Sequence, residues 1–308
     1  IIDFINNHLK PKEFLYINLE DPIFFFNELN IEKLNQFINQ KDIKYLILDQ
    51  LSSTLSILPK VPYIILVTRQ KLPYNLEEIK IENLDYEEFL SIKHTHKFDY
   101  FLKKGSLIEI AKSNRSQSYI NFHNFLRKFF TQKERLFLAI LARFHGKKAT
   151  VNQIYLAAKK DFKISKDWIY EKYQQYLNEE VLYEIKGENS FEKKIYLYDF
   201  ALAKFLYKDI SFLAIFDSII ALILLKNYKN IRLYKGSSFF IEEKKTLLLI
   251  APFETKEAIK KSISRFYNPN IQKIYIITNS NNFKINYKDI EIEALPIFEW
   301  ALISEEEN

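Results

Sequence analysis

Polar residues follow two apolar segments of the sequence, at positions where strands are expected to end. Asp49 and Gln50 follow the segment Tyr45–Leu48, and Thr68 follows Tyr63–Val67. Because the carboxyl ends of parallel strands form the ligand-binding edge of an open α/β sheet, we expect these three side chains at one edge. There Asp49 would hold Mg²⁺ through water beside a phosphate group. Gln50 can orient a water molecule but cannot accept its proton, so the set predicts phosphate binding with slow or absent hydrolysis.

A purely structural interpretation of the same residues stays open. An apolar strand that ends in a polar residue such as Asp49 or Thr68 is common in any parallel sheet. The sequence also contains only 4 glycines and no G-x-x-x-x-G-K-[ST] segment. A loop that cradles phosphates needs glycines so that the backbone can approach closely. The binding of ATP and Mg²⁺ therefore requires a phosphate-binding loop upstream of Ile1.

The elements expected around Asp49 alternate between helix and strand. Helices are expected over 1–9 and 31–39, and strands over 14–19, 45–48 and 63–67. The strand cores are continuously apolar, which is typical of parallel strands covered on both faces. Residues 1–81 are therefore predicted to form a parallel α/β core, and residues 82–130 a helical region with helices over 86–92, 98–103 and 119–130.

Residues 131–207 have the pattern of a winged helix. Helices are expected over 133–144, 151–159 and 166–177, followed by a hairpin of strands 182–185 and 194–197. Ser165 is a suitable N-cap for the third helix, and its outward residues Lys166, Tyr170 and Gln174 could face a DNA major groove. Packing against another part of the protein or a partner stays open, because the acidic Asp167 lies on the same helix.

Residues 208–308 return to an α/β pattern with the strand and helix order of a restriction-endonuclease-like domain. Nuclease chemistry of this kind needs two carboxylates on adjacent strands and a lysine that activates water. The matching segments, Ser237–Ile241 and Leu249–Phe253, carry neither. Glu242, Glu243 and Lys245 are expected in the turn between these strands, so nuclease activity is not expected.

The order of these segments resembles a large prokaryotic family of AAA-type P-loop ATPases that have a winged helix and a nuclease-like domain after the ATPase core. The segments 14–22, 45–50, 63–69 and 84–90 look like its blocks "vlYinledp", "ylilDEi", "iiltGS" and "pLsf.EFl". The segments 98–105 and 193–199 look like "F..yl..GG.P" and "kiYl.Dpgl".

This resemblance implies a P-loop NTPase core that binds ATP and Mg²⁺. Asp49 would be the magnesium residue and Thr68 a sensor near the γ-phosphate, and residues 1–9 would be the remainder of the helix that follows the P-loop. Gln50 stands where the family carries glutamate, and Asp199 is expected to cap the helix that starts at Phe200. The chain differs from the family at the catalytic positions. The resemblance therefore predicts the fold more strongly than it predicts ATP hydrolysis.

Two functions are therefore open. The first is an ATP-binding protein with weak or no hydrolysis, DNA-associated through its winged helix. The second is an inactive scaffold that binds DNA or protein. The net charge of +6 permits nucleic-acid binding without requiring it. The absence of cysteine excludes thiolate catalysis and Cys-ligated zinc. The apolar stretch 212–225 is too short to span a bilayer, so we expect no membrane partner and a cytoplasmic location, and an oligomer is compatible with the sequence.

Overall fold

The computed structural model describes residues 10, 12–24, 29–51, 55, 57–69, 71–93, 98–187, 193–235 and 238–306, without the side chains of 115, 116 and 304–306. The chain divides into two compact units, Ile1–Lys80 (unit 1) and Ile81–Asn308 (unit 2). Unit 1 contains parallel strand pairs and unit 2 both parallel and antiparallel pairs, so the expected α/β class is confirmed. The helix expected over 1–9 lies outside the described residues.

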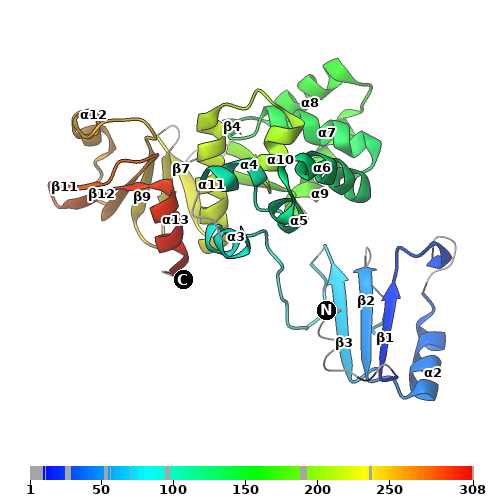
Figure 1. Ribbon diagram of the computed structural model, residues 1–308. Helices are drawn as coiled ribbons and strands as arrows, with labels where there is room; N and C mark the ends of the chain where they lie inside the picture. The colour runs from blue at the N-terminus through cyan, green and yellow to red at the C-terminus, as the bar shows by residue number, and fades with distance from the viewer. Residues whose placement is uncertain are drawn as a thin grey trace. The chain divides into compact units, whose positions relative to one another are not determined.

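Unit 1 contains a three-stranded parallel sheet of order β1-β2-β3, with α2 on one face (Figure 1). Its elements are β1 (Phe14–Asn18), a short 3-10 helix (Pro22–Phe24), α2 (Ile31–Lys41), β2 (Tyr45–Leu51) and β3 (Tyr63–Thr68).

Local sequence explains both ends of α2 and the face that it buries. The Asn30 side chain caps the amino end by accepting a hydrogen bond from the Lys33 N–H at 2.9 Å, and the helix ends at Asp42, whose φ of 51° is left-handed. Leu34 and Ile38 are one turn apart and buried. They form an apolar cluster with alternate strand residues, among them Leu15, Ile17, Leu46, Leu48, Ile64 and Leu66. The other residues of each strand therefore belong to the opposite face of the sheet.

Unit 2 begins with four helices, α3 (Tyr86–Lys93), α4 (Phe98–Lys104), α5 (Ile108–Lys112) and α6 (Arg115–Phe129). Four further described helices and a three-stranded antiparallel sheet of order β4-β6-β5 follow. These elements are α7 (Gln132–Arg143), β4 (Lys147–Lys148), α8 (Val151–Asp161), α9 (Lys166–Asn178), β5 (Leu182–Lys186), β6 (Lys193–Leu197) and α10 (Phe200–Leu206). Thr131 and Thr150 form capping boxes at α7 and α8, and Ser165 caps α9 as expected.

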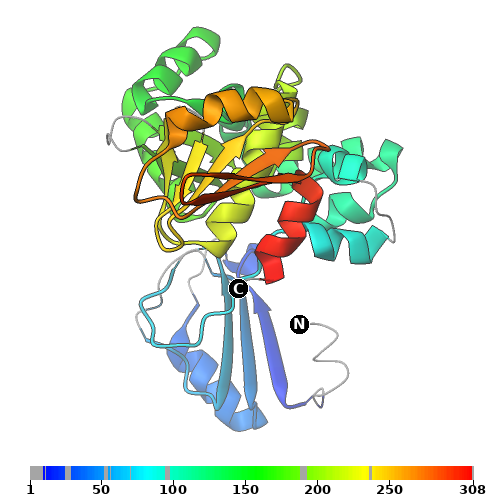
Figure 2. The same cartoon turned by 90° about the vertical axis from the view of Figure 1, so that its left-hand side faces the viewer.

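The last part of unit 2 is a six-stranded mixed sheet of order β11-β12-β10-β9-β8-β7. Figure 2 shows α12 and α13 on opposite faces of this sheet. The elements are α11 (Phe212–Asn227), β7 (Ile231–Tyr234), β8 (Ser238–Ile241), β9 (Thr246–Ile250), α12 (Lys256–Ser262), a 3-10 turn (Ile263–Phe266), β10 (Lys273–Thr278), β11 (Phe283–Tyr287), β12 (Ile290–Pro296) and α13 (Ile297–Glu306).

The larger of two apolar clusters in unit 2 runs through much of this unit, and the smaller one lies between the C-terminal sheet and α12. The larger cluster extends from Tyr86 on α3, through α7 and β6, to Trp300 and Ala301 on α13. A buried ion pair joins β6 to α11, where the Lys194 Nζ lies 2.7 Å from Asp217 Oδ1. The segments 82–130, 131–207 and 208–308 therefore share their interior, and the exact boundaries between them stay predictions.

Candidate functional site

Asp49 lies near the carboxyl end of β2, the central strand of the unit 1 sheet, with Asn18 as its partner on β1. Strand alternation places its side chain on the face opposite α2. Its Oδ2 accepts a hydrogen bond from the Tyr16 hydroxyl at 2.6 Å, and its Oδ1 accepts one from the Gln50 N–H at 2.8 Å. The residue is partly exposed. Because an ionised carboxylate has about four lone-pair sites, this oriented group can still accept a further ligand.

Gln50 has an unusual backbone at the end of β2. Its φ of 58° is left-handed, and the pairing of β2 with β3 shifts register between Leu48 and Leu51. Such irregularities turn a strand locally and change the direction of its side chains. The Leu19 N–H still donates to the Asp49 carbonyl at 3.0 Å, so β1 and β2 stay together beyond this point. The sequence indicated the end of an apolar segment here but not the left-handed residue.

Thr68 lies at the same edge of the sheet as Asp49, as the last residue of β3. It pairs with Leu51. Strand alternation groups it with Ile64 and Leu66, which face α2, whereas Asp49 belongs to the opposite face. The structure thus brings the two predicted site residues to one edge but assigns them to different faces. Asp49 and Thr68 can therefore contact the same ligand only if that ligand extends across the end of the sheet.

Tyr16 is a neighbour of Asp49 that sequence reasoning missed. It pairs with Ile47 on β2, and Asp49 is two residues further along the same face, at a diagonal position. The hydrogen bond to Asp49 raises the pKa of the Tyr16 phenol, so this group remains a protonated donor at neutral pH. Strand register, which a single sequence does not give, was the missing information.

The surroundings of Asp49 suit magnesium only together with a phosphate ligand. Among the described residues no three His, Cys, Asp or Glu side chains are grouped so that they could hold a metal ion. Mg²⁺ usually keeps several waters and is held by one or two carboxylates plus substrate phosphates. Asp49 could supply the carboxylate, while the other ligands would come from water and the phosphates.

A second candidate surface lies on α9 and consists of Lys166, Tyr170 and Gln174, which we name the α9 stripe. All three residues are exposed, and their spacing of four places them along one side of the helix. The Lys166 Nζ lies 5.4 Å from the centre of the Tyr170 ring. The adjoining side of α9 is buried, with Ile169 and Tyr173 in the core. The stripe presents one cation, one aromatic ring and one amide.

The sequence matches no protein-family model and none of the curated proteins.

In the C-terminal sheet, β8 and β9 contain no carboxylate or lysine among the described residues. Glu242, Glu243 and Lys245 lie in the turn between these two strands, as expected. The interior positions of both strands are filled by apolar side chains such as Phe239 and Leu248. β8 and β9 therefore offer no described acidic pair for metal-assisted hydrolysis.

The described helices include none that is both long and apolar enough to cross a membrane. The most apolar, α11, carries Asp217 and Ser218 in its interior, and both are buried within unit 2.

Proposed function

We propose that unit 1 binds ATP with Mg²⁺ at the carboxyl edge of its parallel sheet, and that hydrolysis there is weak or absent. The observation that carries the proposal is Asp49, a partly exposed carboxylate near the end of the central strand. Ligands of open α/β sheets bind at this edge. The order of sequence segments, which resembles AAA-type P-loop ATPases, supports the same nucleotide.

The local contacts of Asp49 support a binding role. Tyr16 and the Gln50 N–H fix the orientation of the carboxylate, and both donors are neutral. The negative charge is therefore oriented without being neutralised by a bonded cation. A carboxylate held in this way can bind a magnesium-bound water, which is how Mg²⁺ is commonly attached to proteins. The 308 residues contain no glycine-rich loop for the phosphates, so the proposal rests on Asp49 and its place at the sheet edge.

Calorimetry of the full-length protein with ATP, in the presence and absence of Mg²⁺, tests the proposal. Asp49→Asn keeps the shape of the side chain and one acceptor oxygen for Tyr16 or the Gln50 N–H, but it removes the charge, so magnesium-dependent binding should be lost. Tyr16→Phe removes one hydrogen bond and leaves the charge, so binding should persist with at most a modest loss. No magnesium-dependent binding of ATP, or equal binding by wild type and Asp49→Asn, would sink the proposal.

Gln50 explains why hydrolysis should be weak. Its amide can orient a water molecule but cannot act as a general base. Gln50→Glu should therefore raise the turnover of bound ATP by roughly 100-fold or more, measured as phosphate release at saturating ATP. An unchanged rate would show that Gln50 is not next to the attacking water.

The α9 stripe favours a second function, the binding of duplex DNA by a winged helix. The order α7, β4, α8, α9 and then the β5-β6 hairpin supports this assignment, and the exposed Lys166, Tyr170 and Gln174 supply groups suited to base edges and phosphates. The exposed acidic residues Asp167 and Glu171 oppose it.

Fluorescence anisotropy with a labelled duplex, measured over a series of salt concentrations, tests this second function. If Lys166 contacts a phosphate, Lys166→Ala should reduce the slope of log affinity against log salt by about 1. Lys103→Ala on α4 is the matched control, because Lys103 is also exposed and lies on another helix. Equal effects of the two substitutions would show that binding depends on net charge and not on α9.

A further inference from the structure

The net charge of the chain is concentrated in one segment of unit 2. Residues 131–178, from the N-cap of α7 to the end of α9, contain ten lysines and arginines and four aspartates and glutamates, so their formal charge is +6. The whole chain also has a net charge of +6, so cations and carboxylates are equal in number in the rest of the sequence. Figure 1 shows α7, α8 and α9 at the end of unit 2 that lies away from the six-stranded sheet. Such a segregation of charge indicates an anionic partner.

Four of these lysines lie at the turn between α8 and α9. Lys159 and Lys160 are in the last turn of α8, Lys163 is in the connection, and Lys166 is the first residue of α9. All four are exposed, and we name them the turn lysines. Because residues 159–166 would span less than about 30 Å even if fully extended, the four charges can contact neighbouring phosphates of one duplex.

The local sequence explains why the turn lysines face solvent. Between the two helices, Phe162 and Ile164 pack against the apolar core of unit 2. Asp161, Lys163 and Ser165 alternate with them and are exposed. Side chains of an extended segment point to opposite sides in turn, and the backbone is extended at Phe162 and Ser165. The two apolar residues therefore fix the connection to the core while its lysine projects outward.

Nearby carboxylates do not neutralise the turn lysines. Asp161 Oδ2 lies 2.5 Å from Arg143 Nη1 of α7, and Glu134 of α7 is paired with a lysine of α9. The turn lysines themselves form no ion pair with any described residue. Asp167 and Glu171 on α9 are exposed, and they reduce the positive excess without cancelling it.

The composition of this surface fits a phosphate backbone better than a protein. Protein interfaces have an apolar centre and few lysines, whereas lysine and arginine make many of the phosphate contacts in protein–DNA complexes. In residues 159–167 every exposed side chain is polar, and the two apolar ones are partly buried. A helix that binds a membrane surface would also expose apolar residues. The turn therefore favours nucleic acid among the anionic partners.

We propose that the turn lysines bind the phosphate backbone of duplex DNA and supply most of the affinity for it, independently of base sequence. The inference rests on the winged-helix function proposed above and names the backbone contacts that this function would use. Each phosphate contact contributes about 0.9 to the dependence of log affinity on log salt. Four contacts at the turn should therefore contribute a slope of about −3.6.

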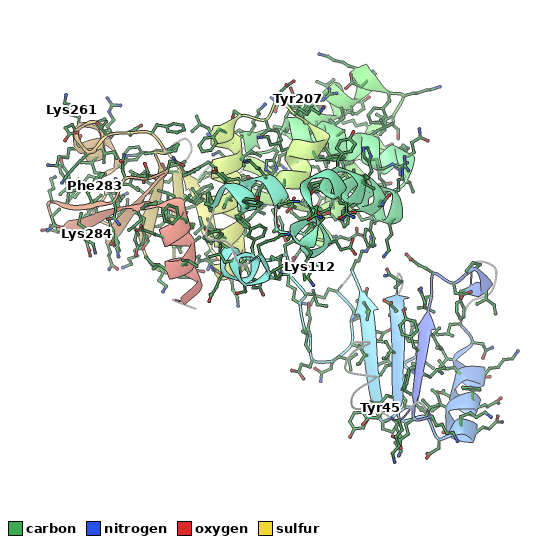
Figure 3. All side chains as sticks on the ribbon, in the orientation of Figure 1. Tyr45, Lys112, Tyr207, Lys261, Phe283 and Lys284 are labelled. Carbon is green, nitrogen blue, oxygen red and sulfur yellow. The ribbon has the colours of Figure 1, made fainter. Side chains whose placement is uncertain are left out.

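Two lysine pairs at equivalent helical positions provide a matched test. Lys159 and Lys160 lie in the last turn of α8, and Lys260 and Lys261 lie in the last turn of α12. All four are exposed. Figure 3 shows Lys261 at the other end of unit 2 from α8 and α9. Loss of either pair removes the same charge, so the comparison separates a local contact from the effect of net charge.

Fluorescence anisotropy with two labelled duplexes of equal length and unrelated sequence, over a series of salt concentrations, measures binding by the full chain. Lys159→Ala/Lys160→Ala should reduce the salt slope by about 1.8 and weaken the binding of both duplexes by about tenfold or more. Lys260→Ala/Lys261→Ala should leave the affinity within about twofold, because long-range charge effects are screened by salt. Equal losses in the two double variants would overturn the proposal.

The same assay distinguishes other partners and the α9 stripe. A loss confined to one duplex would overturn the proposal, because backbone contacts carry no sequence information. Poly-glutamate that displaces the duplex equally well at equal charge would assign the turn lysines to an acidic protein and overturn it too. Lower affinity in Tyr170→Ala/Gln174→Ala, with wild-type binding by Lys159→Ala/Lys160→Ala, would refute this inference alone. A wild type that binds neither duplex would refute the winged-helix function as well.

Discussion

Asp49 in unit 1 and Asp217 in unit 2 are both aspartates that accept a hydrogen bond from a tyrosine hydroxyl, yet their surroundings differ. Asp49 is partly exposed and is bonded by two neutral donors. Asp217 is 5% exposed, and Lys194 and Tyr196 bond its two oxygens at 2.7 and 2.8 Å. Two donors orient each aspartate. Asp49 is open to solvent and is therefore a candidate ligand, whereas Asp217 is buried and its charge is compensated by Lys194, so it holds β6 and α11 together.

Burial has the largest effect on the pKa of Asp217. It raises the pKa of Asp217, although the charge and hydrogen bond of Lys194 act in the opposite direction. Asp199 is similar, since burial raises its pKa against the hydrogen bonds of Leu202 and Ser106. Both carboxylates are therefore expected to matter for stability, and Asp49 for binding.

The largest effect is expected from breaking the buried pair. Lys194→Met leaves Asp217 buried without its counterion and should lower the free energy of unfolding by about 3–5 kcal/mol. Urea denaturation followed by circular dichroism measures it. The double variant Lys194→Met/Asp217→Asn should recover part of the loss, because no charge is then left buried. A loss below about 1 kcal/mol in the single variant would show that water reaches Asp217.

Gly105 should be the next most sensitive position. Its φ is +76°, and an added Cβ would lie 2.5 Å from Asp199 Oδ2, which itself accepts the Ser106 N–H at 2.6 Å. Gly105→Ala should cost about 2–4 kcal/mol, from the left-handed backbone and overpacking together. Gly146→Ala is the matched control, since Gly146 has a similar φ of +71° but its nearest contact would be 3.1 Å. It should cost less in the same thermal or urea assay.

His145 should make the stability of unit 2 depend on pH. This ring is 1% exposed, its Nδ1 accepts the Leu197 N–H at 3.0 Å, and its Nε2 has no partner among the described residues. Burial lowers the pKa of His145 to about 3. The unfolded state therefore binds the proton first, and stability should fall as pH drops from about 6.5 towards 3, by roughly 1.4 kcal/mol per pH unit.

At pH 5 the expected loss is about 2 kcal/mol relative to pH 7.5. His145→Asn, whose side-chain oxygen can replace Nδ1 as acceptor, should be less stable at pH 7.5 but should lose less on acidification. His123→Asn on α6 serves as the control, because it removes a partly exposed histidine. Urea titrations at the two pH values provide the comparison. An unchanged pH dependence in His145→Asn would mean that the folded histidine accepts a proton without cost.

The smallest effects on stability are expected at Asp49. Asp49→Asn and Tyr16→Phe should each change the free energy of unfolding by about 1 kcal/mol or less, because their hydrogen bond is partly exposed. Thermal melting of the full-length protein measures this. If Asp49→Asn destabilised the fold as strongly as Lys194→Met, the contrast between the two aspartates would fail, and Asp49 would be a structural residue.

The sequence predicts best those elements whose signals are local. α8 and α9 begin at Val151 and Lys166 as expected, because Thr150 and Ser165 are N-caps followed by helical apolar periodicity. β4 (Lys147–Lys148) was not predicted, since its two lysines have no strand pattern and it is defined only by pairing with Ile195 and Lys194. β11 (Phe283–Tyr287) was also missed, because its alternation is short and its partner β12 follows it in the chain.

In the candidate site, too, local features were predictable and features that depend on strand pairing were not. The position of Asp49 near a strand end follows from an apolar segment and a polar residue. Its bond with Tyr16 depends on the register of two strands that are distant in sequence, and the left-handed Gln50 depends on an irregularity in the pairing with β3.

The shared core of unit 2 has a consequence for cooperativity. α11 buries ten of its residues, and its Asp217 is bonded to Lys194 and Tyr196 on β6. Separation of the chain near residue 207 would expose this helix and leave a lysine without its counterion. Residues 81–308 should therefore open in hydrogen exchange as one unit, with the amides of β6 and α11 exchanging together.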